Sequence, residues 1–134
     1  MPEGLHYLDT SAYLKLVVAE TESRALRSWV RAQDANVFAS EILRVEALRT
    51  ARRHSPEALL EARERLDAVT LLAVTSDICE RASELDPSIL RSLDAIHLAT
   101  ALSAGDRLQG VLTYDQRLSA ACVAHGVRVI APGQ

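Results

Sequence analysis

Short apolar runs alternate with longer segments of helical periodicity along the chain. Most of these runs lack polar alternation, which is typical of strands covered on both faces in a parallel sheet. They predict strands at Leu5–Leu8, Asn36–Ala39, Val69–Val74, Val111–Thr113 and Val127–Ile130. The segments between them predict helices at Ser11–Ala19, Glu22–Ala32, Glu41–His54 and Pro56–Asp67, and then from Ser76 to Leu85, from Ser92 to Ala104 and from Asp115 to Gly126.

Polar residues and glycines mark the ends of several predicted helices. Ser40 and Ser92 are suited to N-capping the helices that follow them. Gly105 and Gly126 are placed to end the helices before them. The resulting order, β-α-α-β-α-α-β-α-α-β-α-β, predicts an α/β fold, a three-layer α/β/α sandwich with a central parallel sheet. We expect residues 1–134 to form a single domain of this kind.

The composition and charge of the chain argue against two kinds of nucleic-acid-binding protein and against a membrane protein. The net charge is −3 and aromatic residues are 4% of the chain, which argues against a basic coat for nucleic acid and against an RNA-binding sheet of stacked rings. The start of the chain, from Met1 to His6, lacks the basic stretch and apolar core of a signal peptide. No apolar run approaches the roughly 20 residues that span a bilayer. We therefore expect a cytoplasmic protein with no membrane partner.

The chain has two cysteines, Cys79 and Cys122, each in a predicted helix and without a C-x-x-C neighbour. A disulfide scaffold needs more cysteines, and a zinc site needs closely spaced ligands. We expect both cysteines to be buried, reduced and inert.

Two acidic residues directly follow predicted strands. Asp9 comes after the first strand, and Asp115 follows Thr113 at the end of the fourth. Ligands in parallel α/β folds gather beyond the carboxyl ends of the strands, so both acids are candidates for a functional site. Each could instead N-cap the next helix, and Thr113 could either hold a metal-bound water or be an ordinary strand residue.

Two further acids lie on the apolar sides of predicted helices. Asp94 falls on the same side as Leu98 and Leu102, and Glu46 falls between Ile42 and Leu43. Burial of an unpaired carboxylate costs several kcal/mol, so each needs a metal, a cation or hydrogen-bond donors. Structural alternatives are amides of the first helical turn for Asp94, and an ion pair with Arg49 or Arg53 for Glu46.

The four acids are expected at one end of the sheet. Carboxylates sharing a pocket repel one another, and a divalent cation relieves that repulsion. Mg²⁺ or Mn²⁺ fits a site of oxygen ligands better than zinc, which prefers histidine and cysteine. The sequence therefore predicts a site for Mg²⁺ or Mn²⁺.

Four segments of the sequence resemble PIN-domain ribonucleases, in particular the VapC toxins of bacterial type II toxin–antitoxin pairs. They are Leu8-Asp9-Thr10-Ser11-Ala12, Ser40 with Glu46 six residues later, Leu93-Asp94-Ala95-Ile96-His97-Leu98-Ala99-Thr100-Ala101, and Leu112-Thr113-Tyr114-Asp115. The resemblance extends over essentially the whole chain. It implies that the metal ligands are Asp9, Glu46, Asp94 and Asp115, and that the accompanying hydroxyls are Ser11 and Thr113. Some relatives have a further acid after the fourth, which this chain lacks, so the number of metal ions stays open.

The resemblance implies metal-dependent hydrolysis of RNA phosphodiester bonds, in which the cation lowers the pKa of a bound water. An acidic pocket repels phosphate, and Arg91 and Arg117 are close enough in sequence to Asp94 and Asp115 to compensate for it. Either arginine could equally be a solvated surface residue. His97 is expected to be a packed imidazole rather than a catalytic base.

In this family the early helices form a groove for a cognate antitoxin and often a dimer surface. We therefore expect an antitoxin partner and a homodimer, with Tyr13, Leu16, Val17 and Trp29 either in that groove or in the core. The alternative function is a non-catalytic protein-binding module whose acidic pocket recruits a basic partner.

Overall fold

The chain is described by a computed structural model over residues 4–134. Met1–Glu3, which open the stretch that we compared with signal peptides, lie outside the described residues. The element order matches the predicted one. The strands are β1 (Leu5–Leu8), β2 (Asn36–Ser40), β3 (Thr70–Leu72), β4 (Leu108–Leu112) and β5 (Val129–Ile130). The helices are α1 (Thr10–Val17), α2 (Ser23–Gln33), α3 (Ile42–His54), α4 (Pro56–Leu66), α5 (Ser76–Ser83), α6 (Ser92–Leu102) and α7 (Gln116–Ala124), with a 3₁₀ turn, η1 (Gly105–Arg107).

The five strands form one sheet in the order β3-β2-β1-β4-β5, and every neighbouring pair is parallel. Strand β1 lies in the middle, where Tyr7 is opposite Phe38 of β2 and Val111 of β4. The chain proceeds outward from β1 in one direction first and in the other afterwards. The strand order therefore reverses between β1 and β4, and such a switch point opens a crevice at the carboxyl ends of the strands.

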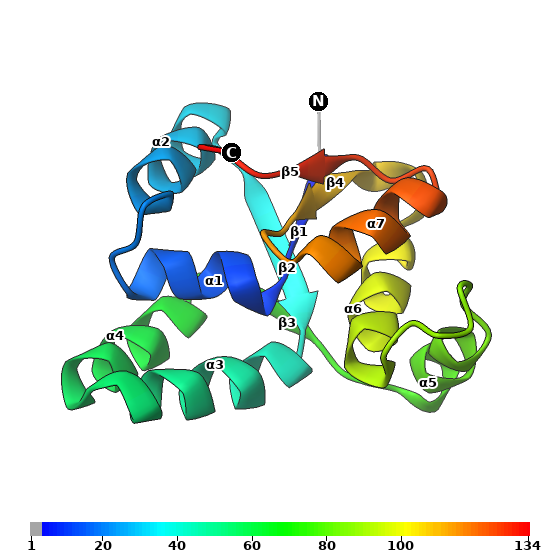
Figure 1. Ribbon diagram of the computed structural model, residues 1–134, viewed down its shortest axis with the longest axis horizontal. Helices are drawn as coiled ribbons and strands as arrows, with labels where there is room; N and C mark the ends of the chain where they lie inside the picture. The colour runs from blue at the N-terminus through cyan, green and yellow to red at the C-terminus, as the bar shows by residue number, and fades with distance from the viewer. Residues whose placement is uncertain (1–3) are drawn as a thin grey trace.

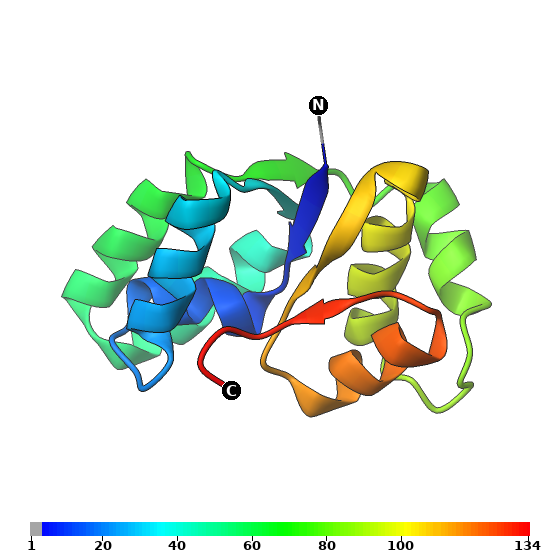
Figure 2. The ribbon, with the colours of Figure 1, turned by 90° about the horizontal axis from the view of Figure 1, so that it is seen from above.

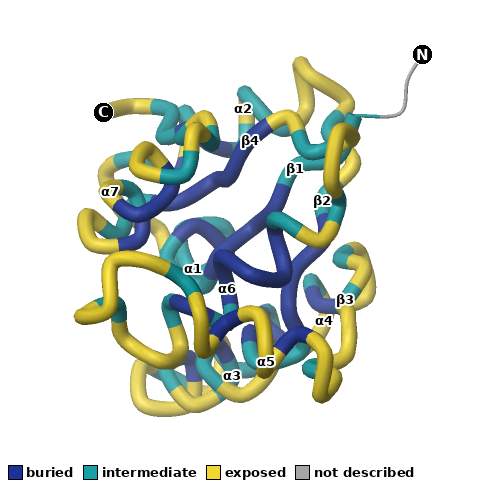
Figure 3. The backbone as a smooth tube through the Cα atoms, turned by 90° about the vertical axis from the view of Figure 1, so that its right-hand side faces the viewer, coloured by how far each residue is buried: buried dark blue, intermediate teal, exposed yellow. Residues whose placement is uncertain are grey.

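Helices cover both faces of this sheet (Figures 1 and 2). Leu8, Ala39 and Leu112 pack against α1–α4 on one face. Tyr7 and Val111 pack against α6 and α7 on the other face, and α5 packs outside α6. Figure 3 shows buried backbone along β1, β4 and α6 beneath a more exposed outer shell. These layers confirm the predicted α/β/α sandwich.

Strand β1 has its predicted bounds, and the bounds of the other four strands differ from the prediction. Strand β3 is shorter because it lies at the edge of the sheet and pairs only with β2. Strand β4 begins at Leu108, three residues earlier than predicted, because Gln109 and Gly110 do not look apolar. A Cβ on Gly110 would lie 2.7 Å from Cδ1 of Ile130 and 3.1 Å from the backbone oxygen of Arg128, so glycine allows β5 to approach closely there.

The two predicted N-caps and the two cysteines have different outcomes. Ser40 remains in β2, paired with Leu72, and Glu41 is the N-cap residue of α3. The Ser40 hydroxyl nevertheless accepts the amide of Ile42 at 3.2 Å, which is the capping contact expected of it. Helix α6 begins after Arg91 rather than after Ser92. Cys122 is buried, but Cys79 is exposed. Its helix buries the stripe that contains Ile78 and Ala82, and Cys79 points about 100° away from Ile78.

Within residues 4–134, no helix has the length and apolar character needed to cross a bilayer.

Candidate active site

The ends of β1 and β4 bring Asp9 and Thr113 into contact. The hydroxyl of Thr113 donates to Oδ2 of Asp9 at 2.6 Å, and the hydroxyl of Ser11 donates to Oδ1 at 2.7 Å. Oδ1 also accepts the Ala12 amide at 2.9 Å, so Asp9 is the N-cap of α1 as well. Asp9 is only 4% exposed. Burial raises the pKa of its carboxyl, and these hydrogen bonds oppose the rise without cancelling it.

The hydroxyls of Ser11 and Thr113 connect Asp9 to the start of α7. Thr113 Oγ1 accepts the amide of Asp115 at 3.0 Å, and Ser11 Oγ accepts the amide of Tyr114 at 2.9 Å. The Asp115 carboxylate caps α7 by accepting the Leu118 amide at 2.9 Å. Both strand-end acids therefore cap a helix, as the structural alternative predicted, and they share one hydroxyl between them.

Asp94 is the third residue of α6 and is partly exposed. Within residues 4–134 its carboxylate accepts no hydrogen bond, so the predicted capping by first-turn amides is absent. Burial raises the pKa of this carboxyl, and the negative charges of Asp115 and Glu46 add to the rise. The interactions of Asp94 with His97 and, to a lesser extent, with Arg91 oppose this rise. The structure thus places Asp94 within electrostatic range of two other candidate acids.

Glu46 is held by residues from other layers of the fold and not by Arg49 or Arg53. Its Oε1 accepts the Thr10 hydroxyl at 2.5 Å and lies 2.8 Å from Nε2 of His97. Burial raises the pKa of the Glu46 carboxyl, but the hydrogen bonds from His97 and Thr10 outweigh burial and hold that pKa below its usual value. His97 is packed, as expected, with 4% exposure.

Sequence reasoning missed two residues of this arrangement, Thr10 and Tyr7. The Tyr7 hydroxyl lies 2.6 Å from Nδ1 of His97. Thr10 was visible as a polar neighbour of Asp9, but Tyr7 reads in the sequence as an apolar strand residue.

The kind of donor at this end of the sheet fits a hard divalent cation, because four carboxylates and the hydroxyls offer oxygen only. The distances between these residues fit a cation less well than their chemistry does. Across residues 4–134, no three histidine, cysteine, aspartate or glutamate side chains are grouped closely enough to hold a metal ion. In the structure, Thr10 and His97 contact Glu46, and both oxygens of Asp9 accept hydroxyl groups.

Two exposed arginines stand beside the acids. Arg91 precedes α6 and Arg117 is the second residue of α7. Both line a cavity of about 330 Å³ whose other walls are apolar, formed by Pro87, Ile89, Leu90, Ala120, Ala121 and Ala124. In the described part of the chain neither arginine forms an ion pair. Both guanidinium groups are therefore available to an anionic ligand.

The early helices carry a separate cavity of about 360 Å³ between α2, α4 and the sheet. Tyr13 lines this cavity and is fully buried, and its hydroxyl donates to the Ala62 carbonyl at 2.5 Å. Arg27, Arg31 and Arg65 bring positive charge to its walls. Leu16 also lines this cavity, while Val17 and Trp29 pack against the core.

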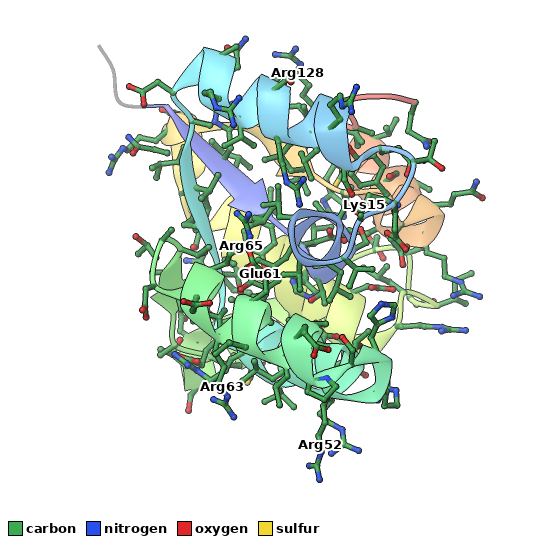
Figure 4. All side chains as sticks on the ribbon, turned by 90° about the vertical axis from the view of Figure 1, so that its left-hand side faces the viewer. Lys15, Arg52, Glu61, Arg63, Arg65 and Arg128 are labelled. Atoms are coloured by element: carbon green, nitrogen blue, oxygen red, sulfur yellow. The ribbon has the colours of Figure 1, made fainter. Side chains whose placement is uncertain are left out.

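The charged surface of α3 and α4 is mostly solvated. Figure 4 shows Arg52 and Arg63 projecting away from the molecule. Arg65 and Glu61 instead lie side by side, 2.5 Å apart, as an i,i+4 pair (Figure 4). Lys15 is paired with Glu20 and Glu22, so it is not a free cation near the acids.

The PIN domain family matches residues 6–124 of the chain. Ribonuclease VapC46 of Mycobacterium tuberculosis is 41% identical over 126 residues, which are 94% of this chain and 96% of that protein. Ribonuclease VapC47 of the same organism is 38% identical over 131 residues, or 95% and 96% of the two chains.

Solved structures share the fold. The crystal structure of the M. tuberculosis toxin VapC20, described as cleaving the sarcin–ricin loop, superposes with a TM-score of 0.73 at 23% identity and covers 95% of this chain and 99% of its own. A chain from a toxin–antitoxin complex of Klebsiella pneumoniae has the same score and identity, and covers 95% and 97%. These matches confirm the resemblance seen in the four sequence segments, and the chain belongs to the PIN-domain family.

Proposed function

We propose that this protein is a divalent-metal-dependent endoribonuclease that acts as the toxin of a toxin–antitoxin pair. The observation that carries the proposal is the buried Asp9 carboxylate at the switch point of the sheet, beside the half-buried Asp94 and Asp115. Relatives that are 38% and 41% identical over nearly the whole chain are named ribonucleases. RNA is the proposed substrate, the cytoplasm the proposed location, and residues 1–134 the proposed single nuclease domain.

Asp9, Glu46, Asp94 and Asp115 would hold the cation, with Mg²⁺ and Mn²⁺ as the proposed ions. When bound, such a cation lowers the pKa of a coordinated water and offsets charge on the leaving oxygen. Ser11 and Thr113 fix both oxygens of Asp9 through hydrogen bonds of 2.7 and 2.6 Å. They thereby set the position of the most buried ligand before substrate arrives.

Arg91 and Arg117 would bind the RNA backbone next to the acids. Arginine pairs with phosphate through two parallel hydrogen bonds, and both side chains are exposed and unpaired within residues 4–134. Their positive charge offsets the repulsion between an acidic site and a polyanion. Binding through them is expected to weaken as salt concentration rises.

The test is cleavage of a structured RNA by purified protein, with and without added Mg²⁺ or Mn²⁺. We expect cutting only with the ion, and none by Asp9→Asn or Asp94→Asn. A matched control is Asp106→Asn, an exposed acid in η1 before β4, at the opposite end of the sheet. Mapping RNA 5′ ends after brief expression of wild type and Asp9→Asn then identifies the cleavage site. Cutting that persists in Asp94→Asn or in excess EDTA would refute the proposal.

The proposed protein partner is a cognate antitoxin, bound over the early helices. The cavity between α2, α4 and the sheet combines apolar walls with three arginines, which suits an apolar segment that carries acidic side chains. The predicted homodimer remains a prediction. Co-expression with the product of a short upstream reading frame should yield a complex that no longer cleaves RNA, and its mass by light scattering reports the number of copies. A complex with undiminished cleavage would contradict this assignment.

A second candidate is the non-catalytic module that recruits a basic partner. Within residues 4–134, no three acidic, histidine or cysteine side chains lie close enough together to hold a metal ion, and this favours the module. Calorimetric titration with Mn²⁺ separates the two functions. Saturable binding that is lost in Glu46→Gln supports the nuclease, whereas no binding to wild type supports the module.

A further inference from the structure

A chain of hydrogen bonds runs from β2 through the core to Glu46. The Ser40 amide donates to the Tyr7 hydroxyl oxygen at 3.1 Å. The same hydroxyl lies 2.6 Å from Nδ1 of His97, and Nε2 of His97 lies 2.8 Å from Oε1 of Glu46. Tyr7 is fully buried and His97 nearly so, which means that water does not compete for the contact between these two side chains.

The direction of each proton in this chain follows from the donors that are present. The Tyr7 oxygen already accepts the Ser40 amide, and its hydroxyl proton has His97 Nδ1 as its close acceptor. A buried hydroxyl proton left without an acceptor is costly, so Tyr7 donates and Nδ1 accepts. Because Nδ1 accepts this hydrogen bond, the ring proton of His97 lies on Nε2. His97 therefore donates from Nε2 to Oε1 of Glu46.

Thr10 adds a second donor to the same oxygen. Its hydroxyl lies 2.5 Å from Oε1 of Glu46 and 3.5 Å from Nε2 of His97. Oε1 is thus saturated by two donors, while Oε2 accepts no hydrogen bond within residues 4–134. One oxygen of Glu46 anchors the side chain and the other stays available.

We infer that Tyr7, His97 and Thr10 are positioning residues that fix Glu46 with Oε1 anchored and Oε2 presented to a divalent cation. This inference rests on the proposed function. Mutation of a residue that hydrogen-bonds to a metal ligand typically costs about 10–100-fold in metal affinity or activity. The hydrogen-bonded residues around Glu46 connect four elements, because they come from β1, α1, α3 and α6.

These residues also couple Glu46 to the helix that carries Asp94. His97 follows Asp94 by three residues, and residues three apart share one side of a helix. The 2.8 Å contact between His97 and Glu46 therefore links α6 to α3, and it limits how far apart the two candidate ligands Asp94 and Glu46 can move.

The test is the affinity for Mn²⁺, measured by calorimetry and by the paramagnetic resonance of free Mn²⁺. We expect about tenfold weaker binding in His97→Leu and in Tyr7→Phe. His97→Gln, whose amide can donate near the position of Nε2, should recover most of the affinity. His54→Leu, at an exposed histidine that ends α3, is the matched control and should bind like wild type.

Nitrogen-resolved NMR of the metal-free protein gives a readout that needs no cation. We expect the proton of His97 on Nε2 in wild type, and a mixture of both tautomers in Tyr7→Phe. A proton on Nδ1 in wild type would overturn the inference, and this holds even if His97→Leu does not fold.

The titrations separate the two failures. If wild type does not bind Mn²⁺, the proposed function fails and the positioning role fails with it. If wild type binds, Glu46→Gln does not, and both Tyr7→Phe and His97→Leu bind as tightly as wild type, the positioning role alone is wrong and the nuclease stands.

Discussion

Asp9 and Asp94 lie at the same end of the sheet but in opposite surroundings. Asp9 is 4% exposed and accepts three hydrogen bonds, from Ser11, Thr113 and the Ala12 amide. Asp94 is half-buried, accepts none within residues 4–134, and faces the charges of Asp115 and Glu46. The comparison teaches that one carboxylate is part of what holds the fold together, whereas the other is a charge that the fold tolerates.

This difference assigns different costs to the same substitution at the two positions. The fold has matched donors to Asp9, so removal of its oxygens leaves hydroxyls and an amide without partners. Removal of the Asp94 carboxylate takes away repulsion and no hydrogen bond. Three predictions test the contrast, from the largest expected effect to the smallest.

Asp9→Ala should lower the free energy of unfolding by about 2 kcal/mol, because it removes a helix N-cap and leaves buried donors unpaired. Asp94→Ala should change it by less than about 0.5 kcal/mol in EDTA. Urea denaturation of both variants measures the pair, with Asp106→Ala as the control. Equal losses of unfolding free energy in Asp9→Ala and Asp94→Ala would show that the two carboxylates do not differ in their contribution to stability.

Thr113→Val should destabilise by about 1 kcal/mol, since it keeps the shape of the side chain but removes the donor to Asp9 and the acceptor for the Asp115 amide. The matched control is Thr100→Val, a buried threonine whose hydroxyl donates only to the Ile96 carbonyl of its own helix. We expect a smaller loss there, together with unchanged Mn²⁺ affinity. A larger loss of stability in Thr100→Val than in Thr113→Val would show that the hydrogen bonds around Asp9 do not contribute more to stability than a hydrogen bond within a helix.

The pH dependence of stability in EDTA sharpens the comparison further. The pKa values of Asp9 and Asp94 are raised in the fold, so the folded chain keeps protons that the unfolded chain has lost. The free energy of unfolding therefore falls as pH rises above the ordinary carboxyl pKa of 3.8. Glu46 acts oppositely, because its pKa is lowered, but its contribution is complete above its ordinary pKa of 4.5.

His6 opposes this trend between about pH 5 and about pH 8, because burial lowers the pKa of its imidazole. Denaturation in a His6→Gln background should therefore show lower stability at about pH 8 than at about pH 5. Asp94→Asn should reduce that difference, and Mn²⁺ should restore stability at the higher pH by binding the ionised carboxylates. A stability that rises with pH in the metal-free protein would mean that repulsion and burial at these acids are weaker than the structure indicates.

Much of the fold was predictable because parallel strands are buried on both faces and appear as continuous apolar runs. Strand β1 was predicted with its observed bounds for this reason. Strand β4 was not, because its first half is Leu108-Gln109-Gly110, and glycine there serves the approach of Ile130 rather than burial. Close approach between strands leaves no periodic signal in the sequence.

The candidate site was predictable in its residues and less so in its partners. Acids that follow strands or lie on apolar helix faces can be identified from local pattern alone. The structural alternative for Glu46 was an ion pair on its own helix, with Arg49 or Arg53. Its actual partners, Thr10 and His97, are 36 and 51 residues away. Such contacts depend on how the layers pack. The family and the fold are confirmed, and the roles of the eight site residues remain predictions.

The central place of β1 has a consequence for when the enzyme becomes dangerous to the cell that makes it. The first strand to leave the ribosome is the middle of the sheet, and Thr113, which holds Asp9, is synthesised 104 residues later. Until that late segment emerges, Asp9 has neither its neighbouring strand nor its hydroxyl. The candidate active site of a nascent chain is therefore incomplete for most of its synthesis. An inhibitor that binds the formed site can act only when synthesis is nearly complete.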